Sequence, residues 1–208
     1  MRDQEDAGLE TIEDIRIRVE AERNAIGSGK LVDGFYSPRA RTDHQARLDR
    51  WKEEWTLCSF AERYNAYNTP RLVWARRNPR GTNRADFSVY GDDRSFLCDV
   101  EVTSLWSAPI VKDPARYEDF STDPYDPMSS PYKMLERVIE KHLRDHYPPY
   151  WLVIWDNEHA VTHPNLDDLA VLVERILAAK TASGRLPTSL QHVWVFDEND
   201  PGPRQVLG

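Results

Sequence analysis

A hairpin-like segment in the middle of the chain limits the fold more than any other feature. In RADFSVYGDDRSFLCDVEVTSL, residues 84–105, apolar and polar side chains alternate on both sides of a polar turn. A period of two is typical of a strand with one buried face, so we expect two antiparallel strands here. With the turn centred on Asp93 and Arg94, Asp86 lies opposite Glu101, and such cross-strand neighbours have Cβ atoms about 4.5 to 5.5 Å apart. The sequence therefore predicts two carboxylates side by side on one face of a sheet.

The segments on either side of the hairpin show helical and strand patterns in turn. Apolar residues at helical spacing predict helices over 9–26, from Asp43 to Asn68, over 132–147 and over 163–182. Short β-branched and aromatic runs predict strands over 71–77, 150–156 and 190–199. The polar, proline-bearing stretch over 106–131 has no period, and we expect it to form a flap. After an N-terminal helix, the expected order is helix, three strands, helix, strand, helix, strand, which indicates an α/β fold.

Length and composition narrow the class of protein. With 208 residues the chain suits one sizeable domain, so we expect an N-terminal helix and connector over 1–42 and one α/β domain over 43–208. No apolar run approaches the roughly 20 residues that span a bilayer, and the charged N-terminus lacks the apolar core of a signal peptide. Cys58 and Cys98 sit in apolar surroundings that suit buried reduced thiols. These features predict a cytoplasmic protein without a membrane partner.

The net charge of −8 argues against general coating of nucleic acid, because phosphate binding depends on lysine and arginine. It leaves a local basic surface open. Such a surface is available between residues 71 and 84, where arginines stand just before Asp86 in the sequence: Arg71, Arg76, Arg77, Arg80 and Arg84. Arginines beside a catalytic site bind phosphates, and we expect Arg76, Arg77, Arg80 and Arg84 to contact substrate. A solvated turn is the alternative.

Two neighbouring carboxylates repel each other, and a shared proton, a cationic partner or a bound metal relieves the repulsion. Mg²⁺ prefers oxygen ligands and keeps several waters, so one or two carboxylates and a substrate phosphate hold it. Such an ion lowers the pKa of a bound water and neutralises charge that develops on a phosphate. The pair therefore favours metal-dependent phosphodiester hydrolysis. A solvent-facing side of the hairpin is the alternative, and Asp99, which shares this face, favours it.

The residues around the pair resemble the motif of the PD-(D/E)XK nuclease superfamily, which has the restriction-endonuclease-like fold. That motif places one acid early in the second strand, and on the third strand a second acid, any residue and usually lysine. ADF at 85–87 and EVT at 101–103 stand in those places. The resemblance covers about Asp43 to Asp156. It implies an αβββαβ core with a mixed central sheet flanked by helices, to which this chain adds an N-terminal helix.

The resemblance also implies a set of functional residues. Asp86 and Glu101 become ligands of Mg²⁺ or Mn²⁺, and Glu54 on the preceding helix completes the metal site, with Glu53 and Glu62 as further candidates. The substrate that it implies is nucleic acid, and DNA is the one we expect.

This chain departs from the family motif at two positions. Ala85 replaces a proline that carries no chemistry. Thr103 replaces the lysine that positions the attacking water and stabilises charge. Members of the superfamily with threonine there resemble this chain, and Lys141 on the next helix is our candidate for the missing cation, with Lys133 second. An inactive site is the alternative.

Other candidate sites have less support from the sequence. His142 and His146 stand four apart on an expected helix, as zinc ligands can, with His159 and His163 downstream. Trp106, at the start of the flap, is a candidate for base stacking. We therefore expect a Mg²⁺-dependent nuclease. The competing hypothesis is a catalytically inactive nuclease-like scaffold that acts as a protein interaction module and uses its N-terminal helix to contact a partner or a second copy.

Overall fold

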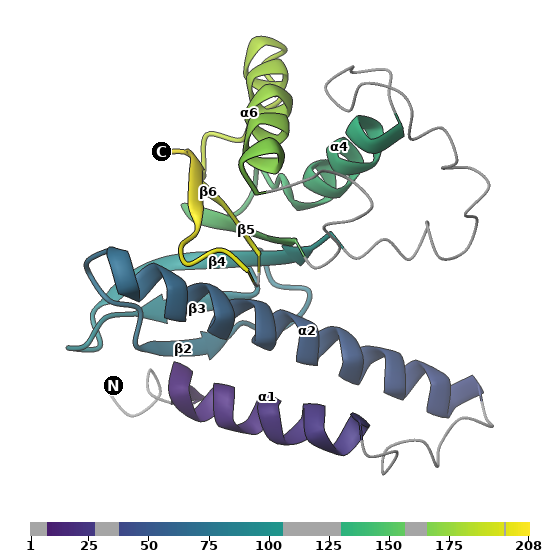
Figure 1. Cartoon of the computed structure of the whole chain (residues 1–208), viewed down its shortest axis with the longest axis vertical. Helices are drawn as coiled ribbons and strands as arrows, with labels where there is room; N and C mark the ends of the chain where they lie inside the picture. The colour runs from purple at the N-terminus through teal and green to yellow at the C-terminus, as the bar shows by residue number, and fades with distance from the viewer. Residues whose placement is uncertain (1–7, 28–37, 106–129, 157–165, 198) are drawn as a thin grey trace.

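The computed structural model describes residues 8–27, 38–105, 130–156, 166–197 and 199–208. These residues form a seven-stranded mixed sheet with helices on both faces (Figure 1). The elements are β1 (Leu9–Thr11), α1 (Ile12–Gly27), α2 (Pro38–Tyr67), β2 (Trp74–Arg77), β3 (Phe87–Tyr90), β4 (Phe96–Ser104), α4 (Ser130–His142), β5 (Tyr150–Asp156), α6 (Leu166–Ala182), β6 (Leu190–Asp197) and β7 (Arg204–Leu207). The expected α/β class is confirmed.

Strand order in the sheet follows the order of the chain, from β1 to β7. Strands β1 to β4 pair antiparallel, β4, β5 and β6 pair parallel, and β7 returns antiparallel to β6. Antiparallel neighbours need only short turns, whereas parallel neighbours need a crossover connection. Helices α4 and α6 lie in the two crossovers. β4 is therefore the strand at which the antiparallel half of the sheet meets the parallel half.

The helices divide between the two faces of the sheet (Figure 1). α1 and α2 pack on one face, where Ile15, Phe60 and Val100 belong to one core cluster. α4 and α6 pack on the other face, where Ile139 and Leu152 belong to a second cluster. The buried Lys180 of α6 also bonds Glu136 and Glu140 of α4, which ties these two helices together. Because side chains alternate along a strand, the odd-numbered residues Asp99 to Thr103 of β4 point to the α4 face.

The register expected for the hairpin is confirmed. Phe87 pairs with Val100 and Ser88 with Asp99, so one step further along the strands brings Asp86 opposite Glu101. The turn contains Arg94 with a φ of 62°. Val89 pairs with Cys98 and Tyr90 with Phe96, so Leu97 of β4 is the extra residue of a bulge. A left-handed residue in a three-residue hairpin loop followed by a bulge is a common way to match the twist of two strands.

Several boundaries differ from the sequence predictions. α2 begins at Pro38 and not at Asp43, because proline suits the first turn of a helix, where its missing N–H is not needed. The expected domain boundary at residue 43 therefore falls inside α2, and α1 contributes Ile12, Ile15 and Val19 to the same core as α2. β1 falls within the segment predicted as the first helix, and β7 follows the last predicted strand. Both are short edge strands that extend the sheet.

Candidate functional site

Asp86 and Glu101 form the centre of the candidate site. Asp86 stands immediately before β3, and its Oδ2 accepts a hydrogen bond of 3.0 Å from the backbone N–H of Val102 in β4. Burial, and after it the charge of Glu101, raise the pKa of Asp86 from 3.8 to about 7. Near neutral pH Asp86 is therefore still partly protonated, unless a cation takes the place of its proton.

His142, at the C-terminal end of α4, lies on the acid pair. Its Nδ1 is 2.8 Å from Oε1 of Glu101. The backbone at this point is fixed by Tyr150, the first residue of β5: its hydroxyl donates to the carbonyl of His142 at 3.0 Å and accepts the N–H of Arg144 at 3.1 Å. The His142 side chain is 24% exposed and that of Glu101 is 7% exposed, so solvent reaches this contact from the side of the imidazole.

The connection from α4 to β5 brings further groups to the pair. Burial raises the pKa of Tyr147, and the charges of Glu101 and Asp86 raise it further, while Arg144 lowers it by a hydrogen bond and by its charge. Tyr147 therefore lies within electrostatic reach of both carboxylates, and Arg144 lies beside Tyr147. The backbone of Arg144 is held by the hydroxyl of Ser189, which donates to its carbonyl at 3.2 Å. Sequence reasoning missed Arg144, Tyr147 and Tyr150, and it considered His142 only as a zinc ligand.

Asp99 shares the face of the pair but has a different environment. It is 0% exposed, its Oδ1 accepts the hydroxyl of Ser88 at 2.7 Å, and its Oδ2 accepts Nε of Arg84 at 3.2 Å. The amide of Asn78 donates to the carbonyl of Ala85 and so connects this network to the chain before β3. Asp99 therefore has both of its oxygens engaged by protein groups.

Glu54, which the sequence assigned to the metal site, pairs with arginines on the α1 side. Its carboxylate lies within 3.0 to 3.4 Å of guanidinium nitrogens of Arg18, Arg50 and Arg77. The neighbouring Glu53 pairs with Arg77 and Arg80, and its charge is among the causes that raise the pKa of Asp86. Glu53 is thus the α2 carboxylate whose charge acts on the pair. Glu53 and Glu54 are adjacent on α2, yet their carboxylates have different surroundings. The distance of a residue from the end of the predicted helix does not show which of the two acts on Asp86.

The remaining predicted residues are spread around the pair. Thr103 is half-buried on the same face, two residues beyond Glu101. Lys141 is exposed, and as the neighbour of His142 it points about 100° away round the helix. Arg80 is exposed, and Arg76 lies over the ring of Tyr90 with 6.0 Å between its guanidinium carbon and the ring centroid.

The donor set of the pair fits a hard divalent cation. Two carboxylates supply oxygen ligands, and Mg²⁺ or Mn²⁺ completes its shell with waters and a substrate phosphate. Among the described residues, no group of three or more His, Cys, Asp or Glu side chains is already arranged to hold a metal. An ion held by these two carboxylates would therefore complete most of its coordination shell with other ligands.

Comparison of the chain with family models, curated proteins and solved structures finds no match.

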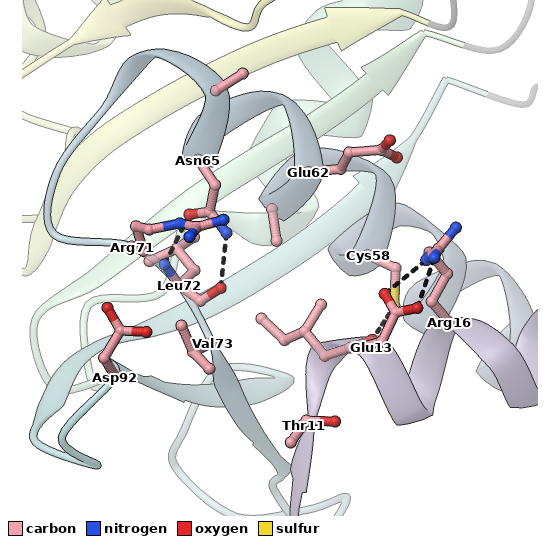
Figure 2. A pocket seen from close by; sticks show the side chains of 13 residues that line it. Thr11, Glu13, Arg16, Cys58, Glu62, Asn65, Arg71, Leu72, Val73 and Asp92 are labelled. Atoms are coloured by element: carbon pink, nitrogen blue, oxygen red, sulfur yellow. Dashed lines mark hydrogen bonds and ion pairs between the residues drawn. The ribbon is translucent and has the colours of Figure 1, made fainter.

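A pocket lies on the opposite face of the sheet, between α1 and α2. This pocket of about 610 Å³ has an apolar floor that includes Ile12 and Leu72. Figure 2 shows Arg71 and Asp92 at one end and Glu13 with Arg16 at the other. Glu62 also lines it and thus lies away from the acid pair. Burial raises the pKa of Cys58, in the wall of the pocket, to about 12, and both Cys58 and Cys98 are buried free thiols, as expected.

The zinc hypothesis required His142 and His146 on one helix. α4 ends at His142, so the two histidines are not one helical turn apart, and the ring of His146 packs edge-on against Tyr147 at 5.2 Å. His159, His163, Trp106 and most of the expected flap fall outside the described residues. In the part of the chain that the structure describes, no helix has the length and apolar character that crossing a membrane requires.

Proposed function

We propose that this protein is a nuclease that depends on a divalent metal and hydrolyses phosphodiester bonds, with DNA as its expected substrate. The observation that carries the proposal is the placement of Asp86 opposite Glu101, with a pKa of Asp86 raised to about 7. When a carboxylate pair retains a proton at neutral pH, replacement of that proton by a divalent cation is favourable, because the cation relieves the repulsion between the two charges.

The order of elements supports the proposal. α2, the three antiparallel strands β2 to β4, the crossover helix α4 and the parallel strand β5 follow one another in the order αβββαβ. This is the order that the resemblance to PD-(D/E)XK nucleases implies. One acid immediately precedes its second strand, and the other lies on its third. We therefore propose a restriction-endonuclease-like core for residues 38–156, with α1 and β1 as additions.

The residues of the site divide the work of hydrolysis. The metal, when bound, supplies an activated water and neutralises charge on the phosphate. Asp86 and Glu101 hold it, and the hydroxyl of Thr103, on the same face as Glu101, helps to orient the attacking water. Arg144, whose charge acts on the neighbouring Tyr147, is our candidate for the charge stabilisation that lysine provides in the family. The exposed Lys141 lies further out, where it contacts the substrate backbone.

Arginines on and after β2 provide a surface for the nucleic acid backbone. Arg80 is exposed, and Arg77 lies between Glu53, Glu54 and the ring of Phe87. We propose that Arg80 and Arg76 contact phosphates. Because Arg84 already pairs with the buried Asp99, we assign it a structural part in addition to any contact with substrate.

Cleavage of end-labelled single-stranded and double-stranded DNA, with RNA in parallel, tests the proposal. The wild type should cut at least one of these in Mn²⁺ or Mg²⁺ and lose activity in EDTA. Asp86→Asn and Glu101→Gln should each lower the rate by about 100-fold or more, as removal of a charge-stabilising group does. Asp92→Asn changes an exposed carboxylate in the turn of the same hairpin and serves as the control, with full activity. Equal activity in all four proteins would show that the pair is not catalytic.

A second candidate function is a protein interaction module, and the pocket between α1 and α2 favours it. Three charged side chains at this pocket, Glu62, Arg71 and Asp92, make no hydrogen bond or ion pair with the described residues, so a partner segment could use them. The two candidates differ in one simple property. An interaction module has a melting temperature that ignores Mn²⁺, whereas a metal site in the folded chain raises it by mass action.

A further inference from the structure

We propose that His142 is a third ligand of the metal, and that the site consequently prefers a transition-metal dication of the Mn²⁺ type to Mg²⁺. The inference rests on the proposed function, because it assumes a metal at Asp86 and Glu101. The inference goes beyond the proposed function in two ways. It adds a nitrogen ligand from α4 that the acid motif does not contain, and it names the class of metal.

The distance between His142 and Glu101 is close to that of two ligands on one ion. Two atoms about 2.1 Å from an octahedral metal, at right angles to each other, are about 3.0 Å apart. Nδ1 of His142 and Oε1 of Glu101 are 2.8 Å apart. A metal can therefore take the place of the proton between them if the two atoms separate by a few tenths of an ångström.

His142 is held where a ligand must be. The hydroxyl of Tyr150 bonds the carbonyl of His142 and the N–H of Arg144, so the end of α4 is fixed against the first residue of β5. β5 in turn pairs with β4, with Tyr150 beside Asp99 and Leu152 beside Glu101. Both partners of the hydrogen bond are thus anchored to neighbouring strands, and little conformational entropy remains to be lost on binding.

Asp86 must move for all three groups to share one ion, since the described residues contain no ready-made group of three. Oδ2 of Asp86 accepts the N–H of Val102, and its other oxygen accepts no hydrogen bond from a described residue. A small rotation of this carboxylate directs that oxygen to the ion and relieves the repulsion from Glu101, which raises the free energy of the metal-free site.

The kind of ligand decides the kind of metal. Mg²⁺ selects oxygen ligands and gives up its waters reluctantly, whereas imidazole nitrogen suits transition dications. Carboxylates suit Mg²⁺, Ca²⁺ and Mn²⁺. A site with two carboxylates and one imidazole therefore favours dications that accept both kinds of ligand. Among these, Mn²⁺ is the one best suited to carboxylate oxygen ligands. Thr103 in place of lysine leaves no competing ammonium on this face of β4.

Pulsed electron paramagnetic resonance of Mn²⁺ bound to the protein is the direct test, because a coordinated imidazole nitrogen modulates the electron spin echo. Wild type and His146→Gln, a matched exposed histidine, should show ¹⁴N modulation, and His142→Gln should lose it. In wild type grown with ¹⁵N-histidine the modulation should change to that of ¹⁵N, a measurement that needs no variant to fold. Calorimetric titration should show that His142→Gln loses at least about 10-fold in Mn²⁺ affinity, the loss that even hydrogen-bond partners of metal ligands cause, while Mg²⁺ affinity changes less.

The outcomes separate this inference from the proposed function. If Mn²⁺ binds to wild type and not to Asp86→Asn, but without histidine modulation and equally well to His142→Gln, the acid pair is the metal site and the inference is wrong. If wild type binds neither Mn²⁺ nor Mg²⁺, with or without an oligonucleotide, the proposed function fails and the inference with it.

Discussion

Asp86 is a carboxylic acid whose surroundings oppose ionisation. Burial is the largest cause that raises its pKa, and the charge of Glu101 is the second. The hydrogen bond from Val102 and the charge of Arg77 lower the pKa but do not offset these two causes. A group in this state costs stability whenever it is charged. Its position immediately before β3 makes sense if an ion compensates for that cost in the functional protein.

The pH dependence of stability follows from this pKa. The carboxyl has a pKa of 3.8 in the unfolded chain and about 7 in the folded chain, so between these values the folded state binds the extra proton. Stability in EDTA therefore falls as pH rises from about 4 to about 7, and the loss is complete above that range. Asp86→Asn keeps an acceptor for the N–H of Val102 and cannot ionise. By urea unfolding, it should match wild type near pH 4 and exceed it at pH 8, by on the order of 4 kcal/mol. A constant difference between the two proteins across this range would show that Asp86 ionises freely.

Arg84 tests whether an arginine near the pair serves substrate or structure. Its guanidinium is 40% exposed and pairs with Asp99, which is fully buried. Arg84→Ala leaves that carboxylate with only the hydroxyl of Ser88, and because part of the pair is solvated we expect a loss of about 1–3 kcal/mol in the free energy of unfolding. The control is Arg80→Ala, whose exposed pair with Glu53 at 3.5 Å should change stability by less than about 0.5 kcal/mol. Equal stability of the two variants would return Arg84 to the list of purely substrate-binding residues.

At the residue scale, the sequence predicted what local pattern determines. Asp86 and Glu101 could be paired because strand parity and the turn set the register. His142 could not be placed on Glu101, since that contact depends on how the crossover helix ends over β4, and no spacing in the sequence encodes it. Glu53 and Glu54 are adjacent in the sequence. The charge of one acts on Asp86, while the other pairs with Arg18, Arg50 and Arg77, and only the rotation of α2 about its axis in the packed structure decides which is which.

At the scale of elements, Thr11 performs two tasks at the junction of β1 and α1. It is the last residue of the edge strand, and its Oγ1 accepts the N–H of Asp14 at 3.0 Å, which caps the first turn of α1. Serine, threonine and aspartate caps satisfy one of the free N–H groups at a helix start. The sequence pattern predicts a helix that includes Leu9–Thr11, because a three-residue strand has too few residues to show alternation.

Replacement of this cap gives a clear prediction. Thr11→Ala should destabilise the protein by about 1 kcal/mol and lower the melting temperature by roughly 2–4 °C, whereas Thr11→Ser, which keeps the hydroxyl, should lie close to wild type. Thermal unfolding followed by circular dichroism measures both. Identical melting of Thr11→Ala and Thr11→Ser would mean that pairing of β1 with β2, and not the cap, fixes the start of α1.

At the scale of the whole molecule, the candidate site lies where the two halves of the sheet meet. Glu101 is on β4, which pairs antiparallel with β3 and parallel with β5, and the crossover through α4 returns the chain to this point. The order of helices and strands, and hence the α/β class, followed from periodicity alone. The two edge strands did not, because β1 and β7 are short and their hydrogen bonds to β2 and β6 are tertiary contacts. The acid pair thus lies on the α4 face of the sheet, and the pocket of about 610 Å³ lies on the α1–α2 face.

Calorimetric titration of Mn²⁺ at pH 8, without substrate, tests the central claim most directly. The claim predicts one site per chain in wild type and in Asp92→Asn, and none in Asp86→Asn or in Glu101→Gln. Circular dichroism should show that all four proteins are folded, so that a loss of binding reports the site. Binding of Mn²⁺ with unchanged affinity in Asp86→Asn and Glu101→Gln would contradict the claim, because the metal would then lie elsewhere in the molecule.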